Sequence, residues 1–191
     1  KTRILKKLLE TDGYLSGQEL CEQLGVSRTA VWKYMKQLKE EGYEIEAVQN
    51  KGYCLKDVPD VLGESEIKSR LHTRWAGQTL YYYDEIDSTN TQIKRLAEED
   101  APHGTLAVAD YQSRGKGRRG RAWDSPHGSA IYMSILFRPE IRPDRASMLT
   151  LVIGLSVTQA IRSNLGLQAQ IKWPNDVVLN GKKLVGILTE M

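Results

Sequence analysis

The chain has 191 residues, 40% of them hydrophobic, and a formal net charge of 27 − 24 = +3. This length favours two domains, and the ordinary apolar content predicts a folded protein. Two cysteines without metal-ligand spacing favour a reducing compartment rather than a disulfide framework. The longest apolar run, MLTLVIGLSVTQAI, is too short and too polar to span a membrane, and the N-terminus lacks the apolar stretch of a signal peptide. We therefore expect a cytoplasmic protein with no membrane contact.

The first 55 residues carry the pattern of a helix-turn-helix. SGQELCEQLG begins with Ser16, which can cap a helix while Glu19 reaches back to complete a capping box, and it ends at Gly25. VSRTAVWKYMKQLKEEG starts again with Ser27 as the N-cap and stops at Gly42. Apolar side chains recur along it at helical spacing, so both segments are predicted to be helices joined by a short turn.

Two further segments complete this domain. Residues 2–9 predict a preceding helix, and YEIEAVQNKGYCL predicts two strands joined by a turn at residues 50–52. Three helices and a hairpin form a winged helix-turn-helix, and the start of its second motif helix carries groups suited to base or phosphate contact. The candidate DNA contacts are Ser27, Arg28, Thr29, Ala30, Trp32, Lys33 and Tyr34.

Net charge does not support DNA binding, because residues 1–58 contain ten Lys or Arg and nine Asp or Glu. The shape of the motif favours it, and the alternative is a winged helix that contacts only other proteins. A single domain of this size makes few contacts, so tight and specific binding requires a dimer on a two-fold repeated site.

The segment KDVPDVLGES predicts a linker, because it combines Pro, Gly and acidic residues. We place a DNA-binding domain at residues 1–58, the linker at 59–63 and a second domain at 64–191.

In the second domain, mixed helices and strands predict an α+β fold, with helices packed on a mixed sheet. The chain lacks an initiator Met and ends in a strand-like segment, LVGILTEM, so we expect its last sheet to lack neighbours. The expected elements are helices at 64–71 and 88–100, the latter capped by Ser88, strands at 79–86 and 104–112, a long strand at 129–138, a long and mostly buried helix at 144–166, and a hairpin turning at Asn180-Gly181.

A basic, glycine-rich loop, SRGKGRRGRAWDS (113–125), lies between two strands of the second domain. Its glycines let the backbone approach a ligand closely, and its arginines offer bidentate hydrogen bonds to phosphate or carboxylate. A nucleic-acid clamp more often spreads its cations over several elements. The loop taken alone therefore leaves two alternatives open, a small phosphorylated ligand and a solvated loop without a ligand.

Three separated motifs resemble those of biotin protein ligases. They are GKGRRGRAWDSP at 115–126, DSTN at 87–90 and KWPND at 172–176, followed by Lys183. With a winged helix in front, the chain is similar along its whole length to the bifunctional ligase–repressor members. The resemblance implies an enzyme that joins biotin and ATP into biotinyl-5′-AMP and transfers biotin to a lysine of a biotin carboxyl carrier protein, an acetyl-CoA carboxylase subunit. It also implies an adenylate-bound homodimer that binds biotin operator DNA and represses transcription.

Adenylation accounts for a basic loop, because an anionic carboxylate must approach an anionic phosphate. Cations, Mg²⁺ among them, offset the repulsion, and an ordered loop excludes water from the adenylate. The resemblance implies catalytic roles for Arg118, Lys183 and Asp176, with no fixed metal site but Mg²⁺ entering with ATP near Asp176. The biotin contacts that it implies are Ser88, Thr89, Asn90, Gln112, Lys116, Gly117, Arg118, Lys183 and Gly186. The nucleotide contacts that it implies are Gly115, Arg121, Trp123 and Asn175.

Several alternatives stay open at this level. Lys183 also fits a plain surface lysine of a hairpin, and Trp173 fits a core position as well as a ligand contact. Lys116 stands where many family members have Arg, so a bidentate contact is lost and adenylate retention is expected to be weaker. The alternative functions are a biotin-responsive repressor with little ligase activity and a lipoate–protein ligase. The basic loop and the DNA-binding domain favour biotin over lipoate.

Overall fold

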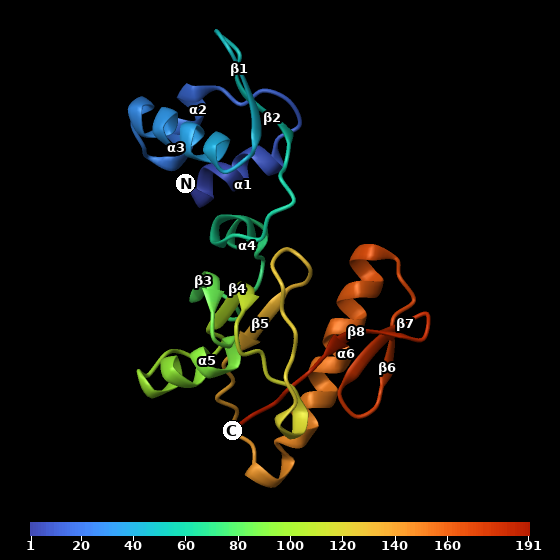
Figure 1. The fold of residues 1–191 in the computed structure, drawn as a ribbon. Helices are drawn as coiled ribbons and strands as arrows, with labels where there is room; N and C mark the ends of the chain where they lie inside the picture. The colour runs from blue at the N-terminus through green and yellow to red at the C-terminus, as the bar shows by residue number, and fades with distance from the viewer.

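The computed structural model describes residues 1–191, except for the side chain of Pro143. Its N-terminal part is the predicted winged helix-turn-helix (Figure 1). Ser16 and Ser27 accept the backbone N–H groups of Glu19 and Ala30 at 3.0 and 3.2 Å, which confirms both N-caps. The Glu19 carboxylate accepts a hydrogen bond from Gln23, which departs from the expected capping box. The elements of this part are α1 (Thr2–Glu10), α2 (Gly17–Leu24), α3 (Arg28–Glu40), β1 (Glu44–Val48) and β2 (Gly52–Asp57).

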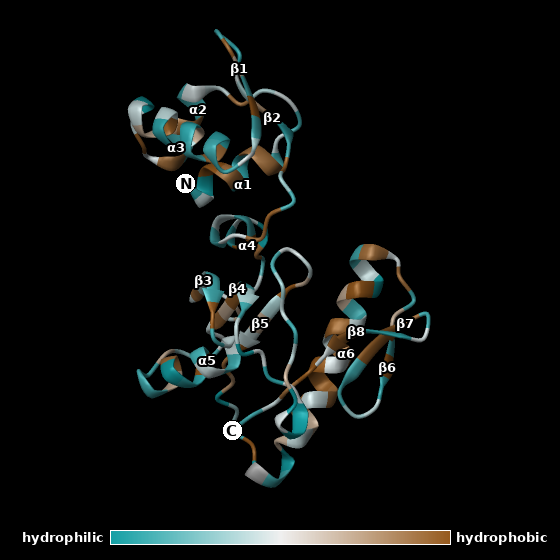
Figure 2. Cartoon of the chain, viewed as in Figure 1, coloured by the Kyte–Doolittle hydropathy of each residue, from teal (hydrophilic) through white to brown (hydrophobic). Residues whose placement is uncertain are grey.

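Apolar side chains from all three helices form one core beneath the hairpin. Val31, Met35 and Leu38 of α3 are buried there with Leu5 of α1 and Leu20 of α2. Because these side chains point inward, the opposite face of α3 is turned to solvent and is largely hydrophilic (Figure 2).

The hairpin of β1 and β2 is fixed at its turn by Asn50 and Gly52, which have φ values of 64° and 110°. Gly52 lies against the chain before α2, and an added Cβ would stand 2.2 Å from the Leu15 oxygen. Leu15 and Tyr53 exchange backbone hydrogen bonds of 2.8 and 2.9 Å. The turn therefore requires glycine for both its backbone angle and its space.

Helix α4 (Glu64–Arg70) follows the predicted linker and packs against both α1 and β3 (Figure 1). The Tyr43 hydroxyl, just before β1, donates to Glu66 of α4 at 2.7 Å. Burial and this acidic partner raise the pKa of the Tyr43 phenol above its ordinary value. The predicted helix is confirmed, whereas the domain bounds at residues 58 and 63 stay a prediction.

The first sheet of the second part is mixed, as predicted. Strand β3 (Leu80–Ile86) pairs in parallel with β4 (Leu106–Gln112), and β4 pairs antiparallel with β5 (Tyr132–Ile135). Helix α5 (Thr89–Glu98) connects β3 to β4 and packs against β4 and β5. Because α5 follows β3 directly and β3 runs parallel to β4, the start of α5 lies beside the carboxyl ends of both strands.

Strand β5 is shorter than the strand predicted at 129–138. The carboxyl end of β4 is hydrogen-bonded instead to the loop that precedes β5. The Gln112 N–H donates to the Ser125 carbonyl at 3.2 Å, and the Asp110 carboxylate accepts the Gly128 N–H at 3.1 Å. A strand ends where the hydrogen-bonding groups of its neighbour are already taken.

The second sheet is antiparallel and stands with α6 beside the mixed sheet (Figure 1). Its last two strands turn at Asn180 and Gly181, with φ values of 50° and 76°, which confirms the predicted hairpin. The elements here are two 3₁₀ turns (Arg118–Gly120 and Pro143–Arg145), α6 (Ser147–Leu165), β6 (Gln170–Lys172), β7 (Asp176–Leu179) and β8 (Lys182–Gly186).

The prediction that the long helix is mostly buried is wrong. Gly154 and Thr158 are its buried residues, and α6 packs against β6 and β7 along one side. A helix that is apolar all round needs neighbours on every side to be buried. Among the described residues, no helix is long and apolar enough to cross a membrane. Much of α6 has the colour of hydrophobic residues in Figure 2. The apolar side chains that α6 exposes are Met148, Leu151, Val152, Leu155 and Leu165.

Candidate functional site

The carboxyl ends of β3 and β4 and the start of α5 converge on one polar cluster. The Thr89 N–H and hydroxyl both donate to Gln112 Oε1, at 2.9 and 3.1 Å. Gln112 Nε2 donates to the Ser125 hydroxyl at 2.9 Å, and the Ser134 hydroxyl donates to Thr89 Oγ1 at 2.8 Å. Thr89, Ser125 and Ser134 are buried, so these groups satisfy one another in place of water.

Ser88 occupies the N-cap position of α5, but the predicted capping role of its side chain is wrong. The Gln112 side chain takes the first helical N–H instead. Ser88 is buried, and its N–H donates to Asp87 at 2.7 Å. Partial desolvation opposes ionisation of Asp87, but the Arg95 guanidinium at 2.7 Å and the Ser88 N–H outweigh it and lower the pKa of Asp87.

Asn90 faces the segment that follows β8. Its Nδ2 donates to Glu190 at 3.0 Å and to the Leu188 carbonyl at 3.5 Å, and its Oδ1 accepts from the Ser134 hydroxyl. The Asn90 amide and the Lys94 ammonium, the latter at 3.1 Å, lower the pKa of Glu190. The cluster at the start of α5 is thus joined to the end of the chain.

The basic loop folds back on itself. The Trp123 N–H donates to the Gly115 carbonyl at 2.9 Å, and the Gly117 N–H donates to the Arg121 carbonyl at 2.7 Å. A Cβ on Gly115 would stand 2.2 Å from the Trp123 oxygen. Glycine at this position is therefore a steric requirement of the loop's own pairing.

Both ends of the loop are anchored on the mixed sheet. The backbone N–H groups of Ser113 and Arg114 donate to carbonyl oxygens at the end of β3, at 2.9 and 2.8 Å. After the loop, His127 Nδ1 lies 2.7 Å from Asp110 Oδ2, and its ring stacks on Tyr111 at 4.7 Å between centroids. The hydrogen bond with His127 lowers the pKa of Asp110.

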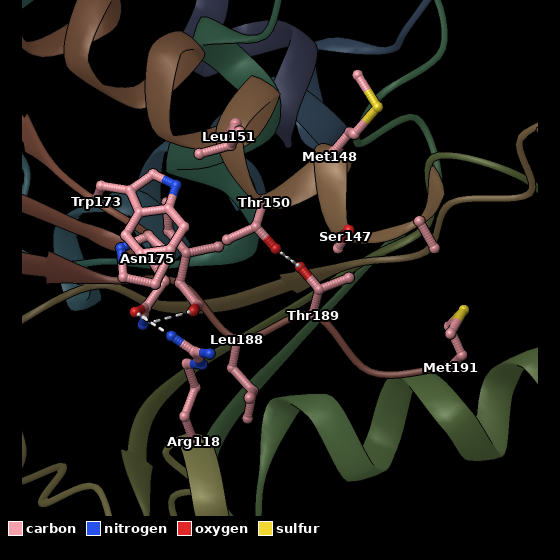
Figure 3. Close-up of a pocket in the computed structure, with 13 residues that line it drawn as sticks. Arg118, Ser147, Met148, Thr150, Leu151, Trp173, Asn175, Leu188, Thr189 and Met191 are labelled. Carbon is pink, nitrogen blue, oxygen red and sulfur yellow. Dashed lines mark hydrogen bonds between the residues drawn. The ribbon is translucent and has the colours of Figure 1, made fainter. Parts of the chain in front are cut away.

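The turn of the loop reaches across to the second sheet. Arg118 Nη1 donates to Asn175 Oδ1 at 2.8 Å, and Asn175 Nδ2 donates to the Ile187 carbonyl at 3.2 Å (Figure 3). These residues border a cavity of about 480 Å³ against α6. Trp173 lines it too and is 77% exposed, so the core alternative for Trp173 is wrong. The other side of the cavity includes Thr150, Leu151, Leu188 and Thr189.

On β8, Lys183 has two partners. Its Nζ lies 2.8 Å from Asp176 Oδ1 and 4.9 Å from the centroid of the Trp123 ring. Among the described residues none gives this buried Asp176 oxygen a hydrogen bond, because the ammonium lies at ion-pair distance without hydrogen-bond geometry. Trp123 also covers Gly186, where an added Cβ would lie 2.7 Å from two ring carbons.

The predicted site residues therefore fall into two groups. Ser88, Thr89, Asn90 and Gln112 gather at the start of α5. Arg118, Trp123, Asn175, Asp176, Lys183 and Gly186 gather where the loop meets the second sheet. The remaining four lie outside both groups and line a second hollow, of about 620 Å³, with Leu188 and Glu190; they are Gly115, Lys116, Gly117 and Arg121.

The candidate DNA contacts lie on the first half of α3 and just before it. Their side chains differ in exposure: Arg28, Thr29, Trp32 and Lys33 are exposed, Ala30 and Tyr34 are half-buried, and the Ser27 hydroxyl caps the helix.

The sequence prediction missed Ser125, Ser134 and the pair Thr150–Thr189, whose hydroxyls lie 2.8 Å apart in the wall of the cavity (Figure 3). Ser134 carries a signal in the sequence, because it occupies an inward position of an alternating strand where an apolar residue is expected. Ser125 carries none, since its role depends on how the loop folds.

Comparison with known proteins agrees with this architecture. Residues 1–54 match an HTH domain family, and residues 82–191 match the biotin/lipoate A/B protein ligase family. The chain is 50% identical over 178 residues to "Bifunctional ligase/repressor BirA" of Bacillus spizizenii, covering 93% of this chain and 55% of that protein. It is 37% identical over 185 residues to the protein of the same name from Escherichia coli, covering 96% and 56%. The chain thus spans little more than half the length of these relatives.

Solved structures give the same family. The biotin protein ligase from Aquifex aeolicus in complex with biotin and ATP has a TM-score of 0.53 and 39% identity, covering 60% of this chain and 47% of that one. The biotin acetyl coenzyme A carboxylase synthetase from Helicobacter pylori has a TM-score of 0.50 and 30% identity, covering 59% and 55%. Since the match at residues 82–191 takes in more than half of its residues, the chain belongs to the biotin/lipoate A/B protein ligase family.

Proposed function

We propose that the chain carries the site of an ATP-dependent biotin ligase that activates biotin and passes it to a lysine of a biotin carboxyl carrier protein. One observation carries the proposal: the basic loop meets the β7–β8 hairpin. Arg118 reaches Asn175 at 2.8 Å, and Lys183 lies 2.8 Å from Asp176 and close to the Trp123 ring. Cations from two distant segments are thereby brought to one region, as the joining of two anions requires.

In the first step a biotin carboxylate oxygen attacks the α-phosphorus of ATP. The new O–P bond forms as the bond to the bridging β-phosphate oxygen breaks, and pyrophosphate leaves with that electron pair. The Arg118 guanidinium and the Lys183 ammonium stabilise the charge that builds on the phosphoryl oxygens. Loss of one such donor lowers the rate by about 10²–10³.

The polar cluster at the start of α5 suits the ureido end of biotin, which presents two N–H donors and a carbonyl acceptor. The Thr89 hydroxyl, the Gln112 amide and the Ser134 hydroxyl together supply donors and acceptors in a buried place. A ligand that enters must replace the hydrogen bonds that these groups make to one another. This requirement favours a ligand with matching polar atoms over the apolar ring of lipoate.

In the second step the neutral amine of the carrier lysine attacks the biotinyl carbonyl carbon. The C–N bond forms, the C–O bond to AMP breaks, and the amine gives up a proton. Asp176, whose buried oxygen has only the Lys183 ammonium beside it in the described residues, is suited to receive that proton or to meet Mg²⁺ brought by ATP. The described residues hold no group of three or more His, Cys, Asp and Glu that could bind a metal by themselves.

The winged helix supports a second role as a repressor. We propose that the adenylate-bound chain forms a homodimer that places two α3 helices on a two-fold repeated biotin operator. Ordering of the loop over the adenylate supplies the ligand-dependent step. Two free cysteines, Cys21 and Cys54, fit the reducing cytoplasm.

Pyrophosphate release with Mg-ATP tests the ligase proposal. The assay compares the 191-residue chain with a chimera in which the Bacillus spizizenii relative supplies the length that this chain does not span. Release that depends on biotin, disappears in Arg118→Ala and persists in Arg119→Ala is the expected result. Arg119 is the matched control because it is exposed in the same turn.

Other outcomes would change the assignment. Release that depends on lipoate would keep the chemistry and overturn the substrate. A chimera without release for either acid would leave the biotin-responsive repressor as the function. Equal affinity for operator DNA with and without biotin and ATP, across protein concentrations, would remove the coupling between the two domains.

A further inference from the structure

Trp32 is the largest exposed side chain on the second motif helix. It lies on α3 and is 61% exposed, on a solvent-facing side of the helix next to the side that carries the buried Val31 and Met35. A single exposed apolar residue is common on protein surfaces. Its position and its neighbours therefore decide whether it has a role.

The neighbours of Trp32 on this face are cations and a small polar residue. Arg28 and Thr29 precede it by one turn, Lys33 follows it directly, and Lys36 lies one turn later; all four are exposed. Across the whole of α3 four Lys or Arg stand against one Glu. This local excess of positive charge fits the phosphates that border a DNA groove, and it favours DNA over a protein as the partner of the Trp32 face.

We propose that Trp32 selects thymine, by packing its indole against the 5-methyl group of that base in the major groove. The inference rests on the proposed DNA-binding function and adds to it the base that one side chain reads. The charged neighbours then contact the DNA phosphates on either side, and Trp32 supplies the contact that depends on the base sequence.

The chemistry of the base edges singles out thymine. Guanine and adenine present acceptors in the major groove, cytosine and adenine present amino donors, and thymine alone adds an apolar group. An indole has one N–H donor and no hydrogen-bond acceptor. It cannot accept from cytosine or bond adenine bidentately, so the thymine methyl is the base-edge group that matches its apolar ring.

Replacement of thymine by uracil tests the proposal, because uracil pairs identically and lacks only the methyl group. The probe is a duplex that the 191-residue chain, with biotin and Mg-ATP present, selects from a pool of random-sequence duplexes at low salt. Each thymine of that duplex is replaced in turn, and affinities are measured at one ionic strength. At one position, replacement of thymine by uracil should weaken the binding of the wild-type chain about fourfold, which is the factor expected for one buried methyl group.

Two variants separate this contact from general effects. Trp32→Ala should bind the thymine and uracil forms equally, and its melting temperature should match the wild type because the side chain is exposed. Lys33→Ala should weaken binding to every duplex while it keeps the fourfold ratio, as expected for loss of a phosphate contact.

Two results would overturn the inference while DNA binding stands. One is a uracil series in which no position weakens the wild-type chain, as a Trp32 that docks on a protein would give. The other is a uracil effect of the same size in Trp32→Ala. A chain that selects no duplex from the pool would overturn the DNA-binding function itself, and the inference with it.

Discussion

Replacement of Gly52 by Ala should unfold the winged helix selectively, and Gly13→Ala is the matched control. The two glycines have similar φ values, 110° and 103°, so both substitutions carry backbone strain of about 1–3 kcal/mol. They differ in the space around them. A Cβ at Gly13 would meet no described atom within 4 Å, whereas one at Gly52 would stand 2.2 Å from the Leu15 oxygen.

The clash at Gly52 has a cost that follows from its surroundings. It pushes Leu15 away from Tyr53 and opens their two hydrogen bonds of 2.8 and 2.9 Å. At about 0.5–1.5 kcal/mol for each bond and about 1–3 kcal/mol for displaced packing, Gly52→Ala should be about 2–6 kcal/mol less stable than Gly13→Ala. The free energy of unfolding of a small domain is about 5–15 kcal/mol in all. The thermal unfolding midpoint of Gly52→Ala should therefore lie more than about 8 °C below that of Gly13→Ala.

Hydrogen-exchange mass spectrometry on the intact chain measures this effect by region. In Gly52→Ala, peptides from residues 1–57 should lose protection, and peptides from residues 82–191 should keep it. Operator binding should disappear while pyrophosphate release continues. Equal stability of the Gly52→Ala and Gly13→Ala variants would refute the steric argument.

Three further predictions concern the candidate site. Lys183→Ala should slow pyrophosphate release by about 10²–10³, and Lys182→Ala, its neighbour on β8, should leave the rate near wild type. Ser134→Ala should raise KM for biotin about two- to tenfold with less effect on kcat, since one hydrogen bond of the buried cluster is lost. The pKa of Asp110 is lowered in the folded chain, so its stabilisation is present above the unfolded pKa of about 3.9 and is lost as the pH falls through the folded value. In His127→Ala that acid-induced loss should shrink, and NMR titration should place the Asp110 pKa higher; an unchanged titration would contradict the assigned cause.

The features that could be predicted from the sequence are those set by local interactions. Ser16 and Ser27 cap helices by binding an N–H three residues away, and Asn180-Gly181 turns a hairpin through its own backbone angles. These interactions involve few residues and depend little on the rest of the fold. The winged helix could therefore be predicted almost element by element.

The features that could not be predicted depend on distant partners. The long helix has an apolar composition that indicates burial, but burial depends on which elements surround it. Strand β5 begins late, at Tyr132 opposite Ala109, because the loop takes the carboxyl end of β4. In the site, motif resemblance singled out Arg118 and Asn175 separately, yet their 2.8 Å contact joins residues 57 positions apart. Ser125 acquires its role only when the loop is folded onto Gln112.

The contact of Tyr43 with Glu66 has a consequence for the proposed binding of two chains to one duplex. Helix α4 touches both α1 and β3, so the orientation of α3 is held by packing and a hydrogen bond rather than by a slack tether. A reading helix with few accessible orientations loses little rotational freedom when it docks. Most of the ordering needed for a paired complex is then complete before DNA arrives. In the proposed homodimer, the packing of α4 against the winged helix would then limit how far apart the two half-sites can lie.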